Sequence, residues 1–133
     1  MNNIKTKFLI KKYKDFFMYE SSLVSLFGFE CGDGWFDLLD SCLSEIKKKI
    51  NNKYNFYITQ IKEKFGTLRI YYSSSGSMED EEDITKILLK YEIKSCKVCE
   101  LCGKKAKLRR IHSWVYTLCE EHYEIEILNR VIS

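Results

Sequence analysis

Residues 99–122 read CELCGKKAKLRRIHSWVYTLCEEH and set the fold of the C-terminal third of the chain. Two short pairs frame this stretch: Cys99-x2-Cys102, then sixteen residues, then Cys119-x2-His122. Tetrahedral zinc takes four thiolate or imidazole ligands, and two chelating pairs separated by a dozen or more residues supply them. We therefore predict one structural Zn²⁺, held by Cys99, Cys102, Cys119 and His122.

The neighbouring residues favour this ligand set but leave alternatives open. Gly103 directly follows the first pair, where a tight metal knuckle needs a backbone turn that glycine permits. Cys96-x2-Cys99 is also an allowed pair, so the sequence leaves open whether Cys96 replaces Cys102 or His122. His112 is a weaker competitor, because we place it at the tip of a hairpin that points away from the knuckle.

Between the two pairs, LRRI and WVYTL are typical of strands, and a helix is predicted from Cys119 onward. Knuckle, hairpin and helix in this order resemble a treble-clef zinc finger, over residues 96 to about 131. Catalytic zinc keeps one coordination position for water, whereas four protein ligands here fill the shell. The sequence thus favours a structural ion and a protein that is not an enzyme.

The rest of the chain predicts helices around one hairpin. Apolar residues at helical spacing indicate helices over 5–20 and 35–50, with a loop over 22–34 in which Asp33 caps the second helix. Aromatic and β-branched residues over 54–72 indicate two strands that turn near Gly66. A capping box at Ser77 and Asp80 begins a third helix, whose acidic first turn (79–83) suits the helix dipole.

We therefore expect an α+β fold: helices packed on a β-hairpin in residues 1–95, and a treble-clef-like zinc-finger module with a C-terminal helix in residues 96–133. The only shift in composition falls near residue 95, where the cysteines begin.

Composition excludes several classes of protein. The 133 residues are 45% hydrophobic and 31% charged, enough for a packed core and too apolar for a disordered chain. No apolar run is long enough to span a membrane, and the lysine-broken N-terminus is not a secretory signal. We expect a cytoplasmic protein, in which six cysteines favour a metal over disulfides.

Two surfaces are candidates for binding. The first is the basic stretch beside the cysteines, opposite Trp114 and Tyr116. Positive charge beside aromatic side chains suits nucleic acid. The alternative is that these cations only balance the negative charge of the zinc thiolates. The residues of this stretch are Lys104, Lys105, Lys107, Arg109 and Arg110. The second combines the start of the helix over 35–50 with the hairpin over 54–72. Free N–H groups at the helix start, together with the nearby cations, suit a phosphate-bearing small molecule. The alternative is a packed hairpin whose lysines are only solvated. The residues of this second surface are Trp35, Lys62, Lys64, Arg69 and Tyr71.

Three motifs, GDGWF (32–36), KEKFGTLRIYY (62–72) and CxxCG…CxxH, together resemble a family of small uncharacterised proteins of bacteriophages and prophages. The resemblance covers roughly residues 30–122, and Cys96 departs from it by adding a cysteine before the usual pair. It implies a phage accessory protein, in the cytoplasm of an infected or lysogenic bacterium, that is an anti-defence factor, a host-takeover factor or a regulator. Of these, we expect a protein that binds and antagonises a host factor. That factor is a nucleotide-like immune signal or a defence protein.

Two other functions are weighed against this one. The first is a zinc-finger regulator that binds nucleic acid through the basic stretch. The second is a metal-dependent nuclease of the His-Asn-His type, for which the chain lacks a histidine: it has two, and His122 is already assigned to zinc. The sequence names neither the ligand nor the oligomeric state.

Overall fold

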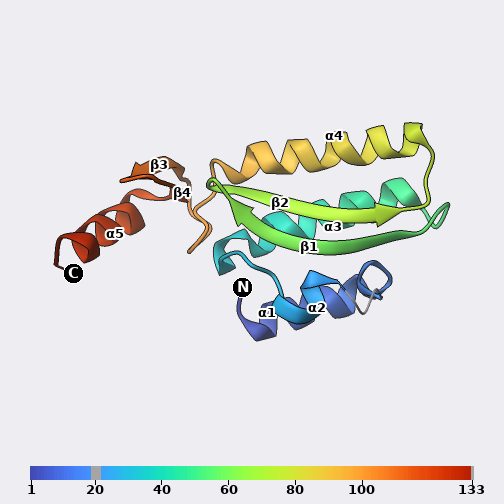
Figure 1. The fold of residues 1–133 in the computed structure, drawn as a ribbon, viewed down its shortest axis with the longest axis horizontal. Helices are drawn as coiled ribbons and strands as arrows, with labels where there is room; N and C mark the ends of the chain where they lie inside the picture. Colours follow the sequence, from blue (N-terminus) through green and yellow to red (C-terminus); the bar gives the residue numbers. More distant parts are fainter. Residues whose placement is uncertain (19–21, 133) are drawn as a thin grey trace.

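The computed structural model describes residues 1–18 and 22–132 and confirms the α+β class. Helices pack on one face and along both edges of one antiparallel hairpin, and a second, smaller hairpin followed by the last helix forms one end of the molecule (Figure 1). The elements are α1 (Asn3–Lys12), the 3-10 helix η1 (Lys14–Phe17), α2 (Leu23–Phe27), the 3-10 helix η2 (Asp33–Trp35), α3 (Phe36–Ile50), β1 (Phe56–Lys64), β2 (Thr67–Ser74), α4 (Met78–Ser95), β3 (Lys107–Ile111), β4 (Trp114–Leu118) and α5 (Glu120–Ile132).

The central hairpin forms where the sequence predicts it. Phe65 and Gly66 make a two-residue turn with positive φ values of 54° and 77°, and such a turn matches the twist of antiparallel strands. The register pairs Lys62 with Arg69, and a bulge lies between Ile58 and Gln60. Because side chains alternate across a strand, this register sends one set of residues toward the helices and the next set outward.

The helices lie on one face and along both edges of this hairpin. In the view of Figure 1, α3 lies behind β1 and β2, α4 runs along the β2 side, and α1 and α2 lie on the β1 side. Glu30 extends the β1 edge as an isolated parallel bridge to Lys62. Within the part of the chain that the structure describes, no helix covers the outward face, which carries Lys62, Arg69 and Tyr71.

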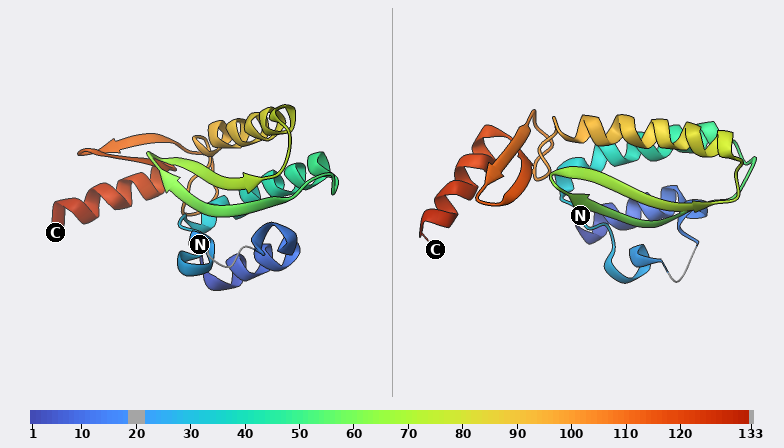
Figure 2. Two further views of the ribbon diagram at one scale, coloured as in Figure 1. Left: turned by 45° about the vertical axis from the view of Figure 1, so that its right-hand side comes forward. Right: turned by 45° about the horizontal axis from the view of Figure 1, so that its top comes forward.

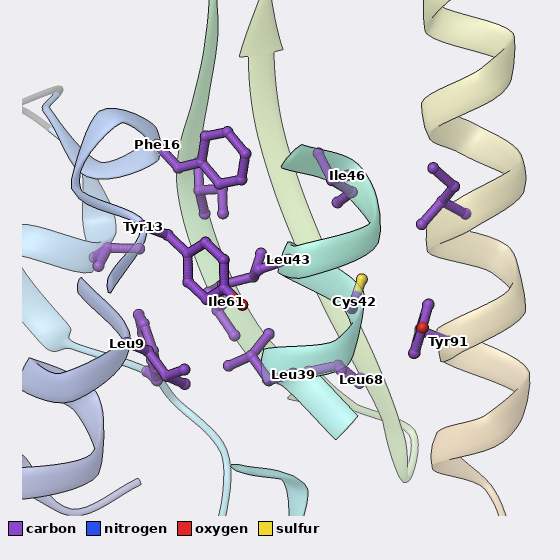
Figure 3. Close-up of a cluster of buried hydrophobic side chains, with 14 of the residues drawn as sticks. Leu9, Tyr13, Phe16, Leu39, Cys42, Leu43, Ile46, Ile61, Leu68 and Tyr91 are labelled. Atoms are coloured by element: carbon purple, nitrogen blue, oxygen red, sulfur yellow. The ribbon is translucent and has the colours of Figure 1, made fainter. Parts of the chain in front are cut away.

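The main core lies between α3 and its neighbours. The apolar stripe predicted over 35–50 faces inward, where Leu39, Cys42, Leu43 and Ile46 are fully buried. Figure 3 shows these side chains between the α1–η1 segment, the hairpin and α4. Cys42 therefore has the core position that its place on the stripe predicts.

The predicted helix over 5–20 is wrong beyond Lys12. The α-helix ends there, and Tyr13 leaves helical geometry because its ring is buried and its hydroxyl donates to the Asp40 side chain and backbone carbonyl. The chain continues as the short 3-10 helix η1, which buries Phe16. Residues 19–20 of the prediction lie outside the described residues.

The predicted loop over 22–34 is also wrong in part. It contains the short helix α2, whose N-cap is the side chain of Ser22. Asp33 is not the N-cap of α3: it lies inside η2, and its carboxylate accepts hydrogen bonds from the backbone and side chain of Asn2. The aspartate thus ties the N-terminus to this segment instead of starting the next helix.

The capping box that begins α4 is confirmed. The Ser77 hydroxyl accepts from the Asp80 backbone, and the Asp80 carboxylate accepts from the Ser77 backbone. The acidic run over 79–83 lies in the first turns of α4, where the helix dipole favours negative charge.

The C-terminal finger, as we name residues 96–132, lies at the end of the molecule where β1 turns into β2 (Figure 2). Its own small core contains Ala106, Ile111 and Leu118 with two of the cysteines. No residue of α5 is fully buried, and Leu128, Val131 and Ile132 are largely exposed. Among residues 1–18 and 22–132, no helix has the length and apolar character needed to cross a bilayer.

Candidate metal centre

The structure brings the four predicted ligands together at one point. One ligand atom from each of Cys99, Cys102, Cys119 and His122 lies within 4.8 Å of the other three. The Sγ atoms of Cys102 and Cys119 are 3.7 Å apart, and the Nδ1 atom of His122 is 3.7 Å from the Sγ of Cys99 and 3.2 Å from that of Cys119. This cluster could hold a metal ion.

Local backbone structure gives each pair its geometry. Cys119 directly precedes α5 and His122 lies in the first turn, so a spacing of three places both side chains on one face of the helix. The first pair lies on a knuckle in which the Cys99 carbonyl accepts from the Gly103 backbone and the Cys99 N–H donates to Lys104. Gly103 has a φ of +81°, a conformation in which side chains other than glycine are strained, as the sequence predicts for this position.

The thiols of the cluster differ in their tendency to ionise. Burial opposes the thiolate of Cys99, but backbone N–H groups of Cys119, Cys102 and Leu101 stabilise it and lower the pKa of Cys99 to about 7. Burial and the neighbouring thiols Cys99 and Cys119 raise the pKa of Cys102. Thiolates this close together repel one another, so each disfavours ionisation of the next. A bound cation would offset that repulsion and stabilise the ionised form of all three thiols.

The GDGW motif packs directly on this knuckle. The Gly34 N–H donates to the Glu100 carbonyl at 2.7 Å, the Gly32 N–H donates to the Glu100 carboxylate at 3.0 Å, and the indole Nε1 of Trp35 donates to the Val98 carbonyl at 2.8 Å. A Cβ atom on Gly34 would lie 2.1 Å from the Cys99 carbonyl oxygen. The motif therefore fits the backbone that carries the first ligand pair.

The turn of the main hairpin forms a second contact with the finger. The Thr117 hydroxyl, fully buried in β4, donates to the Gly66 carbonyl at 2.5 Å. Ser95, also fully buried at the end of α4, accepts from the Leu68 backbone at 2.9 Å and donates to the Glu92 carbonyl. The GDGW and KFG motifs thus share one structural role, which is to hold the finger against the rest of the chain.

The two competing ligands lie outside the cluster. The Sγ of Cys96 faces the Glu92 carbonyl at 3.7 Å, within the last turns of α4. His112 lies in the exposed turn between β3 and β4 and has a φ of +56°. All six cysteines are free thiols, and Cys31 and Cys42 are buried away from the four ligands.

The residues of the basic stretch are not equivalent. The Arg109 side chain is only 14% exposed: it pairs with Glu120 at 3.1 Å, donates to the Leu118 carbonyl and lies over the Tyr123 ring. Lys104 lies 3.7 Å from Glu121. The other three, Lys105, Lys107 and Arg110, are exposed and make no ion pair with the described residues.

The five residues predicted to bind a small molecule are split between two environments. Trp35 is fully buried against the knuckle, so it contributes packing and one hydrogen bond. The other four share the outward face of the main hairpin, where Arg69 pairs with Glu92 at 3.1 Å and Lys64 lies over the Phe65 ring. Their ligand-binding role stays a prediction.

Glu100 and Ser95 join distant segments of the chain through hydrogen bonds, and the sequence pattern predicts neither contact. Their partners, Gly32 and Leu68, are 68 and 27 residues away in the chain. A signal existed only for Glu100, whose place between the two cysteines puts it on the knuckle.

Comparisons of the chain with family models, with curated proteins and with solved structures found no match.

Proposed function

We propose that this is a non-catalytic binding protein whose C-terminal finger is held by one structural zinc ion. The observation that carries the proposal is the convergence of Cys99, Cys102, Cys119 and His122 within 4.8 Å. Zn–S bonds of about 2.3 Å in a tetrahedron place two sulfurs about 3.8 Å apart. The separation of 3.7 Å between Cys102 and Cys119 agrees with that value.

The donor set favours zinc over other divalent ions. Three thiolates and one imidazole are soft or borderline ligands, which suit zinc and disfavour magnesium and calcium. A structural site also needs its ligand-bearing segments to be fixed, and both segments are fixed by Gly34, Trp35 and Thr117. When bound, the ion supplies folding free energy by tying the knuckle to α5.

We assign this zinc protein to the class of phage accessory proteins that bind a host ligand in the bacterial cytoplasm, where thiols stay reduced. The three motifs described above support the assignment. Two of them dock the finger against the rest of the chain, so they serve as a scaffold, and a scaffold leaves its outer surfaces for a partner. The ligand class is a nucleotide-like host signal or a defence protein.

Native mass spectrometry of the protein, purified from a bacterial lysate under reducing conditions, tests this function. We expect one zinc ion per chain together with a retained ligand mass that disappears on denaturation. A chain without stoichiometric zinc would overturn the structural-metal half of the proposal. Reproducible turnover of a substrate would overturn the non-catalytic half.

A second function, nucleic-acid binding by the finger, is favoured by one specific observation. Lys105, Lys107 and Arg110 are exposed without ion pairs among the described residues, and Trp114 at the tip of the same hairpin is 64% exposed. Cations beside an exposed aromatic side chain suit single-stranded nucleic acid. Fluorescence anisotropy of a labelled oligonucleotide tests this: Lys105→Ala with Arg110→Ala should make the negative slope of log K against log salt shallower by roughly 1.4, which corresponds to two lost phosphate contacts.

A further inference from the structure

A groove with aromatic walls lies on the part of the molecule away from the finger. Its volume is about 370 Å³, and it is formed by the end of α1, by η1 and by the segment that joins α3 to β1. Phe16 and Phe56 lie at its base, where both rings are buried and pack edge to face with centroids 4.9 Å apart. Tyr54 and Tyr57 line it as well.

Lysines surround this aromatic base. The groove is lined by four lysines and one acidic residue: Lys11, Lys12, Lys14, Lys47 and Asp15. Lys12 is committed to Asp40 at 2.9 Å. The other three lysines are exposed and have no ion pair within residues 1–18 and 22–132. They converge because α1 and α3 both end at the groove, and cations near helix C-termini are themselves favourable.

We propose that this groove binds a small phosphate ester that carries a planar ring. The ring packs against the half-buried Tyr54 and Tyr57, the phosphate lies among Lys11, Lys14 and Lys47, and the side-chain amides of Asn52 and Asn55 face the remaining polar atoms. The volume lies within the range of pockets that hold small organic ligands. The inference rests on the proposed ligand-binding function and gives that function a site that the sequence did not indicate.

This groove suits such a ligand better than the predicted face around Arg69. On that face, Trp35 is buried and Arg69 is paired with Glu92, which leaves Lys62 and Lys64 as the cations without an ion pair among the described residues. In the groove, cations and aromatic side chains line one cavity. The phosphate needs the cations and the flat ring needs the aromatic side chains, so a ligand that carries both groups needs them in one cavity.

Isothermal titration calorimetry with adenosine 5′-monophosphate and adenosine 5′-triphosphate tests the proposal, with adenosine and inorganic phosphate as the two halves of the ligand. The test variant is Lys14→Ala with Lys47→Ala. The control is Lys7→Ala with Lys48→Ala, which removes two exposed lysines that do not line the groove. All four positions are exposed, so each variant should fold, and thermal melts verify this.

We expect a nucleotide to bind at least about tenfold more tightly than adenosine or phosphate, and the test variant to lose about tenfold or more in affinity while the control stays within about twofold. Absence of saturable nucleotide binding, or an equal loss in both variants, would overturn the groove as a site. Zinc content measured on the same samples separates this failure from failure of the proposed function. One zinc per chain without nucleotide binding would overturn only the groove.

Discussion

The indole Nε1 of Trp35 lies 2.8 Å from the carbonyl oxygen of Val98 and donates a hydrogen bond to it. The bond joins the start of α3 to the knuckle that carries Cys99, across 63 residues of chain. Because Trp35 is fully buried, its ring and its hydrogen bond both contribute to the same contact. The GDGW motif and the cysteine cluster are therefore parts of one structure, although they lie far apart in the sequence.

Replacing this tryptophan should destabilise the whole chain. Trp35→Phe removes the N–H donor and leaves the Val98 carbonyl without its partner, at a cost of about 1–3 kcal/mol in the free energy of unfolding. Urea titration measures the change. Trp114, which is 64% exposed, provides the control: Trp114→Phe should change the free energy by no more than about 0.5 kcal/mol. Equal losses in both variants would contradict this role for Trp35.

Adding one methyl group at Gly34 should disturb the metal centre. The new Cβ of Gly34→Ala would lie 2.1 Å from the Cys99 carbonyl oxygen, so the knuckle must move. We expect lower stability and a lower zinc content after dialysis against a weak chelator.

Gly28→Ala is the matched control for that substitution. Gly28 has a φ of +66°, so alanine is strained there, but its Cβ would meet only Thr6 at 3.9 Å. Stability should fall while zinc content stays unchanged. A normal zinc content in Gly34→Ala would show that the motif does not support the knuckle.

The interaction of Asp40 with the α1–η1 junction should depend on pH. Burial alone would raise the pKa of Asp40, but the Tyr13 hydroxyl and the Lys12 ammonium stabilise its charge and lower the pKa below 3.8. A carboxyl with a depressed folded-state pKa adds stability that is present above pH 3.8 and is lost as the pH falls through the folded pKa.

Chemical denaturation of the wild type and Asp40→Asn at pH 7 and near pH 3 checks this. The wild type should be more stable at pH 7, by at most about 1 kcal/mol because the pair is partly exposed. The difference should shrink at the lower pH. A difference that grows toward pH 3 would contradict the assignment.

Two adjacent arginines should behave differently. Arg109 pairs with Glu120, donates to Leu118 and lies 4.5 Å from the Tyr123 ring centre, so Arg109→Ala should lower the melting temperature of the finger. Arg110→Ala should leave it within about 1 °C, because the exposed Arg110 side chain makes no ion pair with the described residues. Differential scanning calorimetry of both variants decides. A larger effect at Arg110 would reverse the assignment.

The sequence predicts most of the elements and the metal cluster, because both depend on local spacing. A separation of three residues places Cys119 and His122 on one helical face whatever the surroundings, and the stripe over 35–50 needs only helical periodicity. The hairpin turn at Gly66 and the capping box at Ser77 are also set by residues within a few positions.

Features that depend on distant partners could not be predicted. The helix over 5–20 ends early because Tyr13 finds Asp40, which lies 27 residues away. The start of the helix over 35–50 suits a phosphate-bearing ligand when considered alone, yet the glycines that precede it allow a close approach to Glu100 and Cys99. The basic groove follows from α1 and α3 ending at one place, which periodicity does not encode.

The zinc content of two cysteine variants tests whether Cys99, Cys102, Cys119 and His122 hold a structural zinc ion. Inductively coupled plasma mass spectrometry on reduced, dialysed protein should give one zinc per chain for the wild type and for Cys96→Ser, because Cys96 lies outside the cluster. Cys102→Ser should lose the ion and several kcal/mol of stability, about what a structural site contributes to folding. Full zinc content in Cys102→Ser, or loss of zinc in Cys96→Ser, would contradict this ligand set and the structural role of the ion.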